Sequence, residues 1–378
     1  MILSEEQLLI RDTARKFAQE RLAPNSAQWE REAAFPPGIF AELGALGFMG
    51  MTVPVEWGGS GADNVAYSLA LQEIAGGDGA LATVVSGHNS VGVMPILTYG
   101  SEIQKTRYVR DLASGAKLTA FCLTEPQGGS DAAAIRTRAT RKGDSYVLNG
   151  TKQFITSGAT ADIALVIAVT DPGAGKRGIS AFIVDTKTPG YIVSRVEKKM
   201  GQNASDTCEI KLEDCVVPAE NLLGEEGRGY RIALANLEGG RIGIASQCVG
   251  MARAALEIAV RYAHEREAFG KPIFQHQAVS FRLADMAVSL EAAYQLTLHA
   301  AALKDAGRPC LTEASMAKLF ASETAERICS DAIQTLGGVG YIQDFGVERI
   351  YRGVRGAKIY EGTNDIQRLV ISRSLTAG

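Results

Sequence analysis

The spacing of apolar residues divides the chain into three parts. From residue 4 to about residue 118, apolar residues recur at the period of an amphipathic α-helix. Ser4 and Gln7 have the spacing of a capping box, so we expect the first helix to begin there. Turn-rich stretches such as 57–61 separate the helical segments. The inner face of the first helix is predicted to contain Leu8, Leu9, Ala14 and Phe17.

The period changes between about residue 119 and residue 225. Short runs of β-branched and apolar residues predict strands over 145–148, 163–169, 179–184 and 208–212. Asn149 and Gly150 lie between two β-rich segments and predict a hairpin turn. No segment of helix length separates the strands, which excludes a sheet built from βαβ units. The pattern therefore favours a compact antiparallel barrel or sandwich.

A helical period returns near residue 227 and continues to the end of the chain. Segments 241–265, 276–306 and 311–336 are long, rich in alanine and amphipathic, as expected for an antiparallel helical bundle. No internal repeat or low-complexity linker interrupts them. We therefore predict a mainly α protein with a β domain: an N-terminal helical domain over 1–118, a middle antiparallel β-barrel or sandwich over 119–225, and a C-terminal helical bundle over 226–378.

Composition excludes several classes of function. The chain carries 39 basic and 42 acidic residues, a formal net charge of −3, without a long basic run, so we expect no nucleic acid partner and no anionic membrane partner. Six scattered cysteines form no C-x-x-C pair, and only four histidines accompany them. This spacing predicts reduced, mostly buried thiols and no metal site.

The chain also lacks the patterns that direct a protein into or across a membrane. Its first residues do not show the basic-then-apolar order of a secretory signal. The apolar run 163–169 is too short to span a bilayer. We therefore expect no membrane insertion, and a cytoplasmic location in a bacterium; the mature form of a mitochondrial matrix protein is the alternative.

Residues 121–131 form the most unusual peptide of the chain. Gly128 and Gly129 remove side chains just before the hydroxyl of Ser130 and the carboxylate of Asp131. Such a loop lets its backbone approach a ligand closely and donate N–H groups to it. Taken alone, an ordinary glycine turn accounts for the same residues equally well.

Three further segments carry weaker signals. Phe154 and Thr156 share one side of a predicted strand, either as a ligand-binding face or as core residues. Arg266 and Phe269 end a long helix, where an arginine either holds a phosphate or complements the helix dipole. The glycines of 334–341 exceed what a helix end needs, although a glycine-rich turn remains an alternative; no strand precedes them, so a dinucleotide fingerprint is excluded.

Glu361 lies between an apolar–aromatic pair, Ile359 and Tyr360, and a glycine. Thr363 follows as a possible cap of a terminal helix. Neighbours of this kind desolvate a carboxylate and raise its pKa, which suits a general base working near neutral pH. Considered alone, a surface glutamate in a loop is the simpler interpretation.

Together, five segments resemble the acyl-CoA dehydrogenase family. They read CLTEPQGGSD at 122–131, NGTKQFITSG at 149–158, REAFGKPIFQHQ at 266–277, QTLGGVGY at 334–341 and IYEGT at 359–363. The resemblance covers essentially the whole chain, and the motifs occur in the family's order. It implies a helical domain, a β domain and a C-terminal four-helix bundle, with FAD as the cofactor.

The resemblance also implies which residues bind FAD. The segment 121–130 and the peptide 154–156 would cradle the isoalloxazine ring through Phe121, Leu123, Thr124, Gly129, Ser130, Phe154, Ile155 and Thr156. The pyrophosphate and adenosine would be held by Arg266, Phe269 and Gln277, with Gln334, Gly337 and Gly338 of a neighbouring subunit. Thr363 and Asp365 would reach the same cofactor; many relatives have Trp in place of Phe154, and Glu or Gln in place of Asp365. Sharing a cofactor between subunits makes an oligomer expected, and the resemblance implies a homotetramer built as a dimer of dimers.

The family's reaction assigns Glu361 the role of catalytic base. It would remove the α-proton of an acyl-CoA while a hydride leaves the β-carbon for the flavin, and trans-2-enoyl-CoA would form. Electrons would then pass to an electron-transferring flavoprotein. Some members carry the base on the helix of residues 238–241, at the position of Gly240, where this chain offers no carboxylate. The substrate would contact Ser130, Glu238, Arg241, Tyr360 and Gly362.

Substrate and electron acceptor remain open at this stage. Arg241 would support the thioester end, with a structural ion pair as its alternative role. The passages 237–247 and 204–207 resemble short-chain and short-branched-chain members most closely, which favours butyryl, isobutyryl or 2-methylbutyryl thioesters. An acyl-CoA oxidase and a catalytically silent flavin or acyl-CoA binding protein are the rival functions. A nitroalkane-oxidising relative is expected to use Asp as its base, which the YEGT peptide does not offer.

Overall fold

The computed structural model describes residues 1–376. The N-terminal part of the chain is helical. Its helices are α1 (Glu5–Phe17), α2 (Ser26–Glu32), α3 (Ile39–Ala45), α4 (Asn64–Gly77), α5 (Gly79–Gly87), α6 (Met94–Tyr99) and α7 (Glu102–Ala113). The predicted capping box is present, because the Gln7 N–H donates to Ser4 Oγ at 3.1 Å and the Ser4 N–H donates to Gln7 Oε1 at 3.0 Å.

The predicted inner face of α1 is only partly correct. Ala14 and Phe17 are buried, whereas Leu9 is 68% exposed. The helix instead packs through Ile10, which stands four residues before Ala14 and seven before Phe17. Residues at these spacings share one face of an α-helix, so Leu9 is turned away from the core.

The middle part of the chain forms a single mixed sheet. Its strands are β1 (Thr119–Cys122), β2 (Arg138–Lys142), β3 (Ser145–Thr156), β4 (Ile163–Val169), β5 (Ile179–Asp185), β6 (Tyr191–Val196), β7 (Thr207–Pro218) and β8 (Leu222–Leu223). Their order is β6-β7-β3-β2-β4-β5-β8, and β1 pairs with β4. Most neighbours are antiparallel, as expected, but β1 and β2 both pair with β4 in parallel.

The predicted hairpin turn at Asn149 and Gly150 is wrong. Strand β3 continues through both residues and only shifts its register against β7 there. The Asn149 side chain accepts a hydrogen bond from the Asp214 N–H at 2.8 Å, which fixes this bulge. The chain turns earlier, at Gly143, whose φ is +60°.

Strand β4 is buried on both faces. Ile163, Leu165 and Ile167 point into one apolar cluster, and the alternating alanines and Val166 point into the main core. Residues of α6 and α7 and of α8 (Gly229–Ala235) contribute to the first cluster, so helices cover that face. A strand buried on both faces reads as an unbroken apolar run, which explains why β4 was predicted with the correct bounds.

Long helices make up the C-terminal part. They are α9 (Leu237–Glu265), α10 (Gln277–Asp305) and α11 (Leu311–Leu336), followed by the shorter α12 (Gly338–Tyr341), α13 (Val347–Val354) and α14 (Asn364–Ser374). A small hairpin of β9 (Glu267–Ala268) and β10 (Lys271–Pro272) joins α9 to α10. The predicted segments coincide with α10 and α11 to within a residue, and α9 begins four residues earlier than expected.

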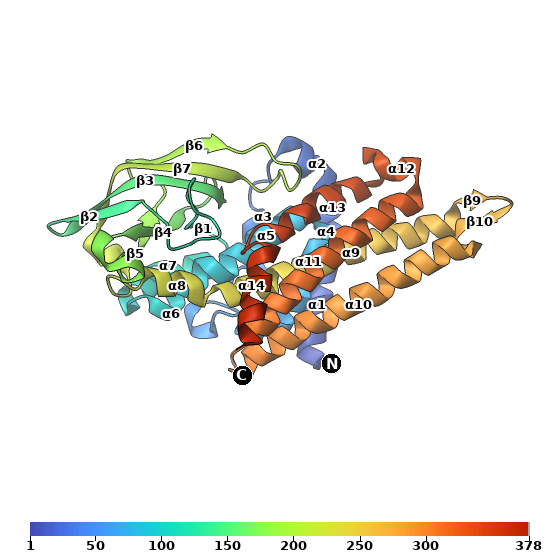
Figure 1. Ribbon diagram of the computed structural model, residues 1–378, viewed down its shortest axis with the longest axis horizontal. Coiled ribbons are helices and arrows are strands. Elements are labelled where there is room, and N and C mark those ends of the chain that lie inside the picture. Colours follow the sequence, from blue (N-terminus) through green and yellow to red (C-terminus); the bar gives the residue numbers. More distant parts are fainter. Residues whose placement is uncertain (377–378) are drawn as a thin grey trace.

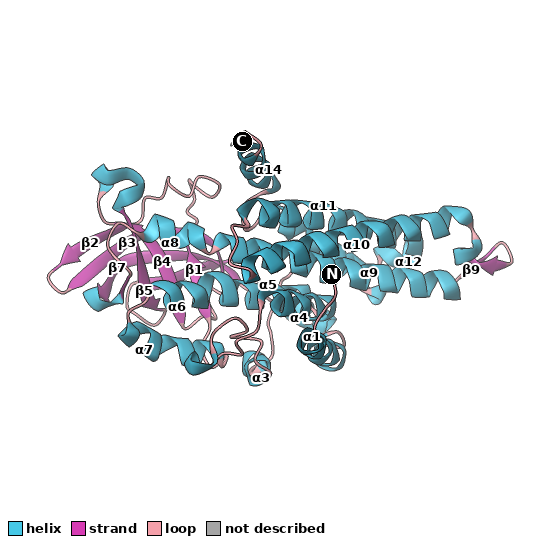
Figure 2. Cartoon of the chain, turned by 90° about the horizontal axis from the view of Figure 1, so that it is seen from below, coloured by secondary structure: helices cyan, strands magenta, loops and turns pink. Residues whose placement is uncertain are grey.

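The molecule is elongated, with the β domain at one end and the β9–β10 hairpin at the other (Figure 1). Helices α9, α10 and α11 run along the molecule between these ends, as a view turned by 90° also shows (Figure 2). Helix α4 packs against α9, so the N-terminal helices share a core with the C-terminal bundle. The six cysteines are free, and all six are buried, as the sequence predicted for most of them.

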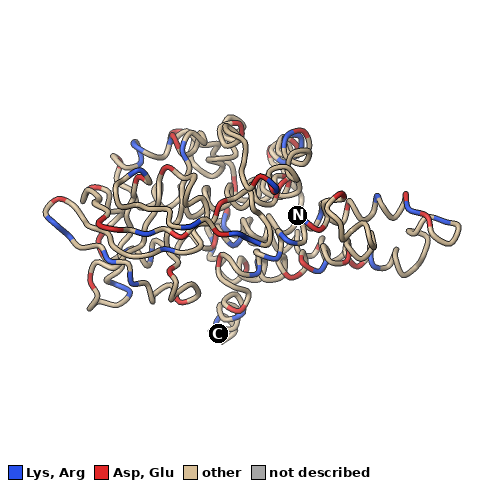
Figure 3. The backbone as a smooth tube through the Cα atoms, turned by 90° about the horizontal axis from the view of Figure 1, so that it is seen from above, with Lys and Arg blue, Asp and Glu red and all other residues tan. Residues whose placement is uncertain are grey.

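Two helical stretches, Gly79–Tyr99 and Gly229–Glu265, have the length and apolar composition of a membrane span. The fractions of these windows that are buried inside the molecule are 78% and 72%. Core helices of this kind pass the same test of length and hydropathy. Basic and acidic residues are interspersed along the whole backbone (Figure 3).

Candidate active site

The Glu361 carboxyl group lies in a desolvated position against helix α9. Glu361 belongs to the loop before α14, and its φ of +55° is unusual for a residue with a side chain. Its Oε2 is inaccessible and has no hydrogen-bond partner within residues 1–376. Burial raises the pKa of this carboxyl to about 7, although the positive charges of Arg241 and Lys318 act to lower it.

Buried donors hold the loop around Glu361. The Gln367 Nε2 donates to the carbonyls of Glu361 at 3.1 Å and Gly362 at 2.8 Å. Lys318 Nζ donates to the Gly362 carbonyl at 2.8 Å and to Asn364 Oδ1 at 2.9 Å. Thr363 caps α14 as predicted, by accepting from the Ile366 N–H. The Glu361 N–H makes no hydrogen bond within residues 1–376.

Arg241 provides a buried positive charge beside this carboxyl. The residue is 5% exposed, and its guanidinium donates to Ser315 Oγ at 3.1 Å. Its Nε has no partner, and no carboxylate of residues 1–376 lies within ion-pair distance of it. Burial lowers the pKa of Arg241, and the charges of Glu361 and Glu238 oppose that shift. The alternative of a structural ion pair therefore finds no support.

The Tyr360 hydroxyl belongs to a closed ring of hydrogen bonds that the sequence did not suggest. It accepts from Gln202 Nε2 at 3.1 Å and donates to Gln247 Oε1 at 2.9 Å. Gln247 Nε2 donates to Thr83 Oγ1 at 2.6 Å, and Thr83 Oγ1 donates to Gln202 Oε1 at 2.6 Å. The ring joins α5, the loop after β6, α9 and the Glu361 loop, so it fixes Tyr360 beside the base.

The peptides 121–130 and 154–156, which the sequence assigned to a flavin, lie against each other. The Gln153 N–H donates to the Thr124 carbonyl at 2.8 Å. A register shift in β3 gives Phe154 a φ of +58° and leaves its ring 59% exposed. Ile155 is buried and anchors this bulge. An exposed aromatic ring beside half-buried and exposed polar groups fits a flat heteroaromatic ligand.

The other predicted cofactor residues are far from this cradle within one chain. Phe269 is 96% exposed. The other residues of this group are exposed as well: Arg266, Gln277, Gln334, Gly337 and Gly338. Arg282 at the start of α10 donates to Thr335 at the end of α11, so these residues share one end of the bundle. That end carries the β9–β10 hairpin, opposite the β domain (Figures 1 and 2). Gly338 begins the short helix α12 rather than an open turn.

The remaining predicted residues differ in their accessibility. Glu238 is half-buried on α9 and accepts a hydrogen bond from Cys310 Sγ at 3.6 Å. Ser130 is exposed at the end of the glycine loop. Asp365 is 91% exposed and lies 3.5 Å from Arg368 in an ion pair on α14. Asp365 is therefore the least constrained of the predicted cofactor ligands.

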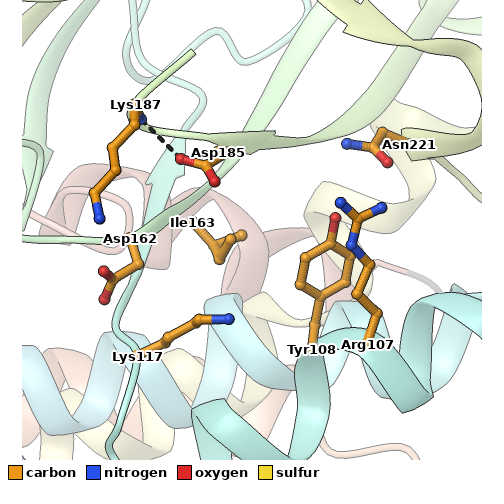
Figure 4. Close-up of a pocket in the computed structure, with 8 residues that line it drawn as sticks. All are labelled: Arg107, Tyr108, Lys117, Asp162, Ile163, Asp185, Lys187 and Asn221. Atoms are coloured by element: carbon orange, nitrogen blue, oxygen red, sulfur yellow. Dashed lines mark hydrogen bonds between the residues drawn. The ribbon is translucent and has the colours of Figure 1, made fainter.

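A pocket of about 160 Å³ lies elsewhere, between α7 and the β domain (Figure 4). Its lining includes Arg107, Lys117, Asp162 and Asp185, and none of the predicted site residues. Lys117 pairs with Asp111 at 2.8 Å, and Asp162 accepts from the Leu118 N–H at 3.0 Å. Because this pocket contains none of the predicted site residues, we place the active site at Glu361 instead.

Comparisons with known proteins give matches over nearly the whole chain. Models of the N-terminal, middle and C-terminal domains of acyl-CoA dehydrogenase match residues 4–116, 120–215 and 227–376. An acyl-CoA dehydrogenase of Bacillus subtilis (strain 168) is 49% identical over 378 residues, all of both chains. The mitochondrial short-chain specific acyl-CoA dehydrogenase of Rattus norvegicus is 47% identical over 373 residues, 99% of this chain and 90% of the relative.

Solved structures give the same result. A chain from work on the electron transferring flavoprotein of Acidaminococcus fermentans and flavin-based electron bifurcation is 44% identical, covers 100% of both chains and has a TM-score of 0.98. Butyryl-CoA dehydrogenase from Megasphaera elsdenii is 41% identical, covers 100% of this chain and 99% of that chain, and has a TM-score of 0.97. Both similarities extend over essentially the full length.

Proposed function

The chain belongs to the acyl-CoA dehydrogenase family, and we propose that it converts short or short-branched acyl-CoA thioesters to trans-2-enoyl-CoA with Glu361 as the base. The observation that supports this most directly is the desolvated, unpartnered Glu361 carboxyl with a pKa of about 7. Such a group is a strong enough base near neutral pH and is still ionised often enough to act.

Glu361 removes the α-proton of the thioester in this proposal. The α-proton is only weakly acidic, so the developing enolate oxygen needs hydrogen-bond donors. The partner-free N–H of Glu361 supplies one such donor. Arg241 supplies a buried positive charge beside the site, which favours negative charge on the reacting groups. Gln367 and Lys318 keep the loop in the conformation that presents both the carboxylate and the N–H.

FAD is the cofactor in this proposal, and when bound it accepts the hydride that leaves the β-carbon. The residues of 121–130 and 154–156, Phe154 among them, would hold its flat ring, and Thr363 and Asp365 would contact the same cofactor. The resemblance assigned only Gln334, Gly337 and Gly338 to a neighbouring subunit, but Arg266, Phe269 and Gln277 lie at the same far end of the bundle. The whole exposed set would therefore hold the remainder of an FAD in the cradle of a neighbouring subunit. This set includes Arg266, Phe269 and Gln277 as well as Gln334, Gly337 and Gly338, and it makes a homotetramer the expected assembly.

An electron-transferring flavoprotein is the proposed electron acceptor. The similarity to a chain from work on such a flavoprotein, at 44% identity over the full length, supports this acceptor over oxygen. Short acyl chains are proposed because relatives named for short-chain and butyryl substrates match over the whole chain.

A visible spectrum followed by anaerobic titration with acyl-CoA thioesters tests the proposed function. We expect a bound yellow flavin that butyryl-, isobutyryl- or 2-methylbutyryl-CoA bleaches, while palmitoyl-CoA bleaches it weakly. Reoxidation by air and by an electron-transferring flavoprotein is then compared, and faster reoxidation by air would favour an oxidase. A bound flavin that no thioester bleaches would favour a silent binding protein.

A further inference from the structure

We propose that the buried ion pair between Lys152 and Glu125 positions the two peptides of the flavin cradle relative to each other. Lys152 and Glu125 would therefore be positioning residues for cofactor binding, although neither side chain reaches the ligand. This inference rests on the proposed function, in which peptides 121–130 and 154–156 receive the flavin ring.

The pair is unusual for its burial. Lys152 Nζ lies 2.7 Å from Glu125 Oε1, and the two side chains are 0% and 2% exposed. In every other ion pair among residues 1–376, at least one side chain is 26% exposed or more. Moving two charges out of water costs free energy that only a fully hydrogen-bonded geometry offsets. An ion pair on the surface would not have this desolvation cost.

Lys152 fastens the loop to strand β3 immediately before Phe154. Its Nζ donates to the Leu123 carbonyl at 3.1 Å as well as to Glu125. The Gln153 N–H donates to the Thr124 carbonyl at 2.8 Å. Three consecutive loop residues are thereby tied to the two strand residues that precede the exposed aromatic ring.

Glu125 closes the loop onto its own far end. Its carboxylate accepts from the Arg136 N–H at 2.6 Å, the Thr137 N–H at 3.0 Å and Gln127 Nε2 at 2.6 Å, besides Lys152. Burial alone would raise the pKa of Glu125, but the charge of Lys152 and these donors outweigh it and lower the pKa to about 2. The carboxylate is therefore ionised at neutral pH and fully satisfied.

The geometry of the pair explains why it acts on the cradle. Gly128 to Ser130 lie inside the loop that Glu125 closes, and Phe154 lies two residues after Lys152. A shift of either partner changes the gap between the loop and the Phe154 ring. Because a ligand site has to be held close to its productive geometry by supporting contacts, such a shift weakens cofactor binding before it unfolds the domain.

The test uses a neutral, nearly isosteric double variant, Glu125→Gln with Lys152→Met, which leaves no unpaired buried charge. The dissociation constant of FAD is measured on the full-length apoprotein by flavin fluorescence, together with the melting temperature of that apoprotein. We expect FAD binding to weaken on the order of tenfold or more, as for other losses of a supporting contact, with the apoprotein still folded. Glu102→Gln with Lys105→Met is the matched control, because it removes a Lys–Glu pair at 2.9 Å whose side chains are 20% and 77% exposed.

Glu125→Asp is the second variant, since it keeps both charges and shortens only the acidic side chain. We expect it to weaken FAD binding as well, and to remain folded. Unchanged FAD affinity in either folded variant would overturn the inference, and so would equal weakening in the surface control. A wild-type chain that binds no FAD would refute the proposed function itself, so the two failures are distinguishable.

Discussion

The carboxylate of Glu361 and the backbone of Gly240 lie so close together that a side chain at position 240 would force the carboxylate to move. A Cβ atom built on Gly240 would stand 2.7 Å from Glu361 Oε2 and 2.9 Å from its carboxyl carbon. Gly240 lies within helix α9, where glycine costs roughly 0.5–1 kcal/mol relative to alanine. The helix therefore carries a destabilising residue at the point where the proposed base needs room.

Gly240→Ala should impair turnover while the protein stays folded. The new methyl group forces the Glu361 carboxylate to move, and a displacement of ~1 Å can reduce a reaction rate by roughly 100-fold. Steady-state kinetics with butyryl-CoA measures the effect. Gly239→Ala is the matched control, because its Cβ would meet only ordinary contacts at 3.7 Å and 3.9 Å. Equal activity of the two variants would show that the Glu361 carboxylate does not need its observed position.

The pH profile of kcat/KM should have an acidic limb with an apparent pKa of about 7. Glu361 acts as a base only when it is ionised, so activity rises as the pH increases through this value. The profile is measured with one short acyl-CoA at fixed ionic strength. A limb near the ordinary pKa of a glutamate, about 4.3, would mean that Glu361 is solvated or is not the base.

Glu361→Gln should abolish most turnover and change how stability depends on pH. Loss of a general base reduces the rate by about 10²–10⁴-fold. The folded carboxyl has a raised pKa, so it binds its proton more tightly than the unfolded chain does. Wild-type stability therefore falls as the pH rises from about 4.5 through about 7, while the variant lacks this loss. Melting temperatures of both proteins at pH 5 and pH 8 measure this loss of stability. If the difference in melting temperature between wild type and variant were the same at both pH values, the raised pKa would be contradicted.

The parts of the fold that the sequence predicted are those with local causes. Strand β4 and helices α10 and α11 follow from burial patterns that repeat within the element itself. Asn149 and Gly150 were misread because a two-residue turn and a bulge favour the same residues. The difference depends on β7, where Asp214 bonds to Asn149 from 65 residues away. The residue pattern around Asn149 and Gly150 does not reveal that this segment pairs with β7.

The candidate site also combines features that the local sequence predicts with features that depend on distant contacts. Glu361 was proposed as the base from the resemblance of its segment to a family motif, whereas Lys318 and Gln367 were not predicted because their importance comes from contacts with the loop. Lys318 lies 44 residues before the carbonyl that it binds. One signal was present, since Ser315, Lys318 and Ser322 follow helical spacing on the buried face of α11. Polar residues repeated on an otherwise apolar face indicate a site that the helix supports.

Lys318→Met should raise the pKa of Glu361 further. The positive charge of Lys318 acts to lower the pKa of Glu361, so its removal moves the acidic limb of kcat/KM to higher pH. The variant also loses the bonds to Gly362 and Asn364, so kcat should fall as well. Lys16→Met, at an exposed position on α1, is the control and should leave the profile unchanged. A profile that does not move in the Lys318 variant would show that this lysine has no electrostatic effect on the base.

Two inactive variants should restore activity to each other if each cofactor site is built from two subunits. Arg266→Ala removes a cofactor contact that one chain would offer to its neighbour, whereas Glu361→Gln disables the base beside the chain's own cradle. Each variant alone forms only defective sites, but a mixed dimer contains one site with both residues intact. Co-expression with two different tags, followed by tandem purification, isolates the mixed assembly. We expect it to recover activity per flavin well above either parent, and no recovery would mean that Arg266 and Glu361 serve the same site within one chain.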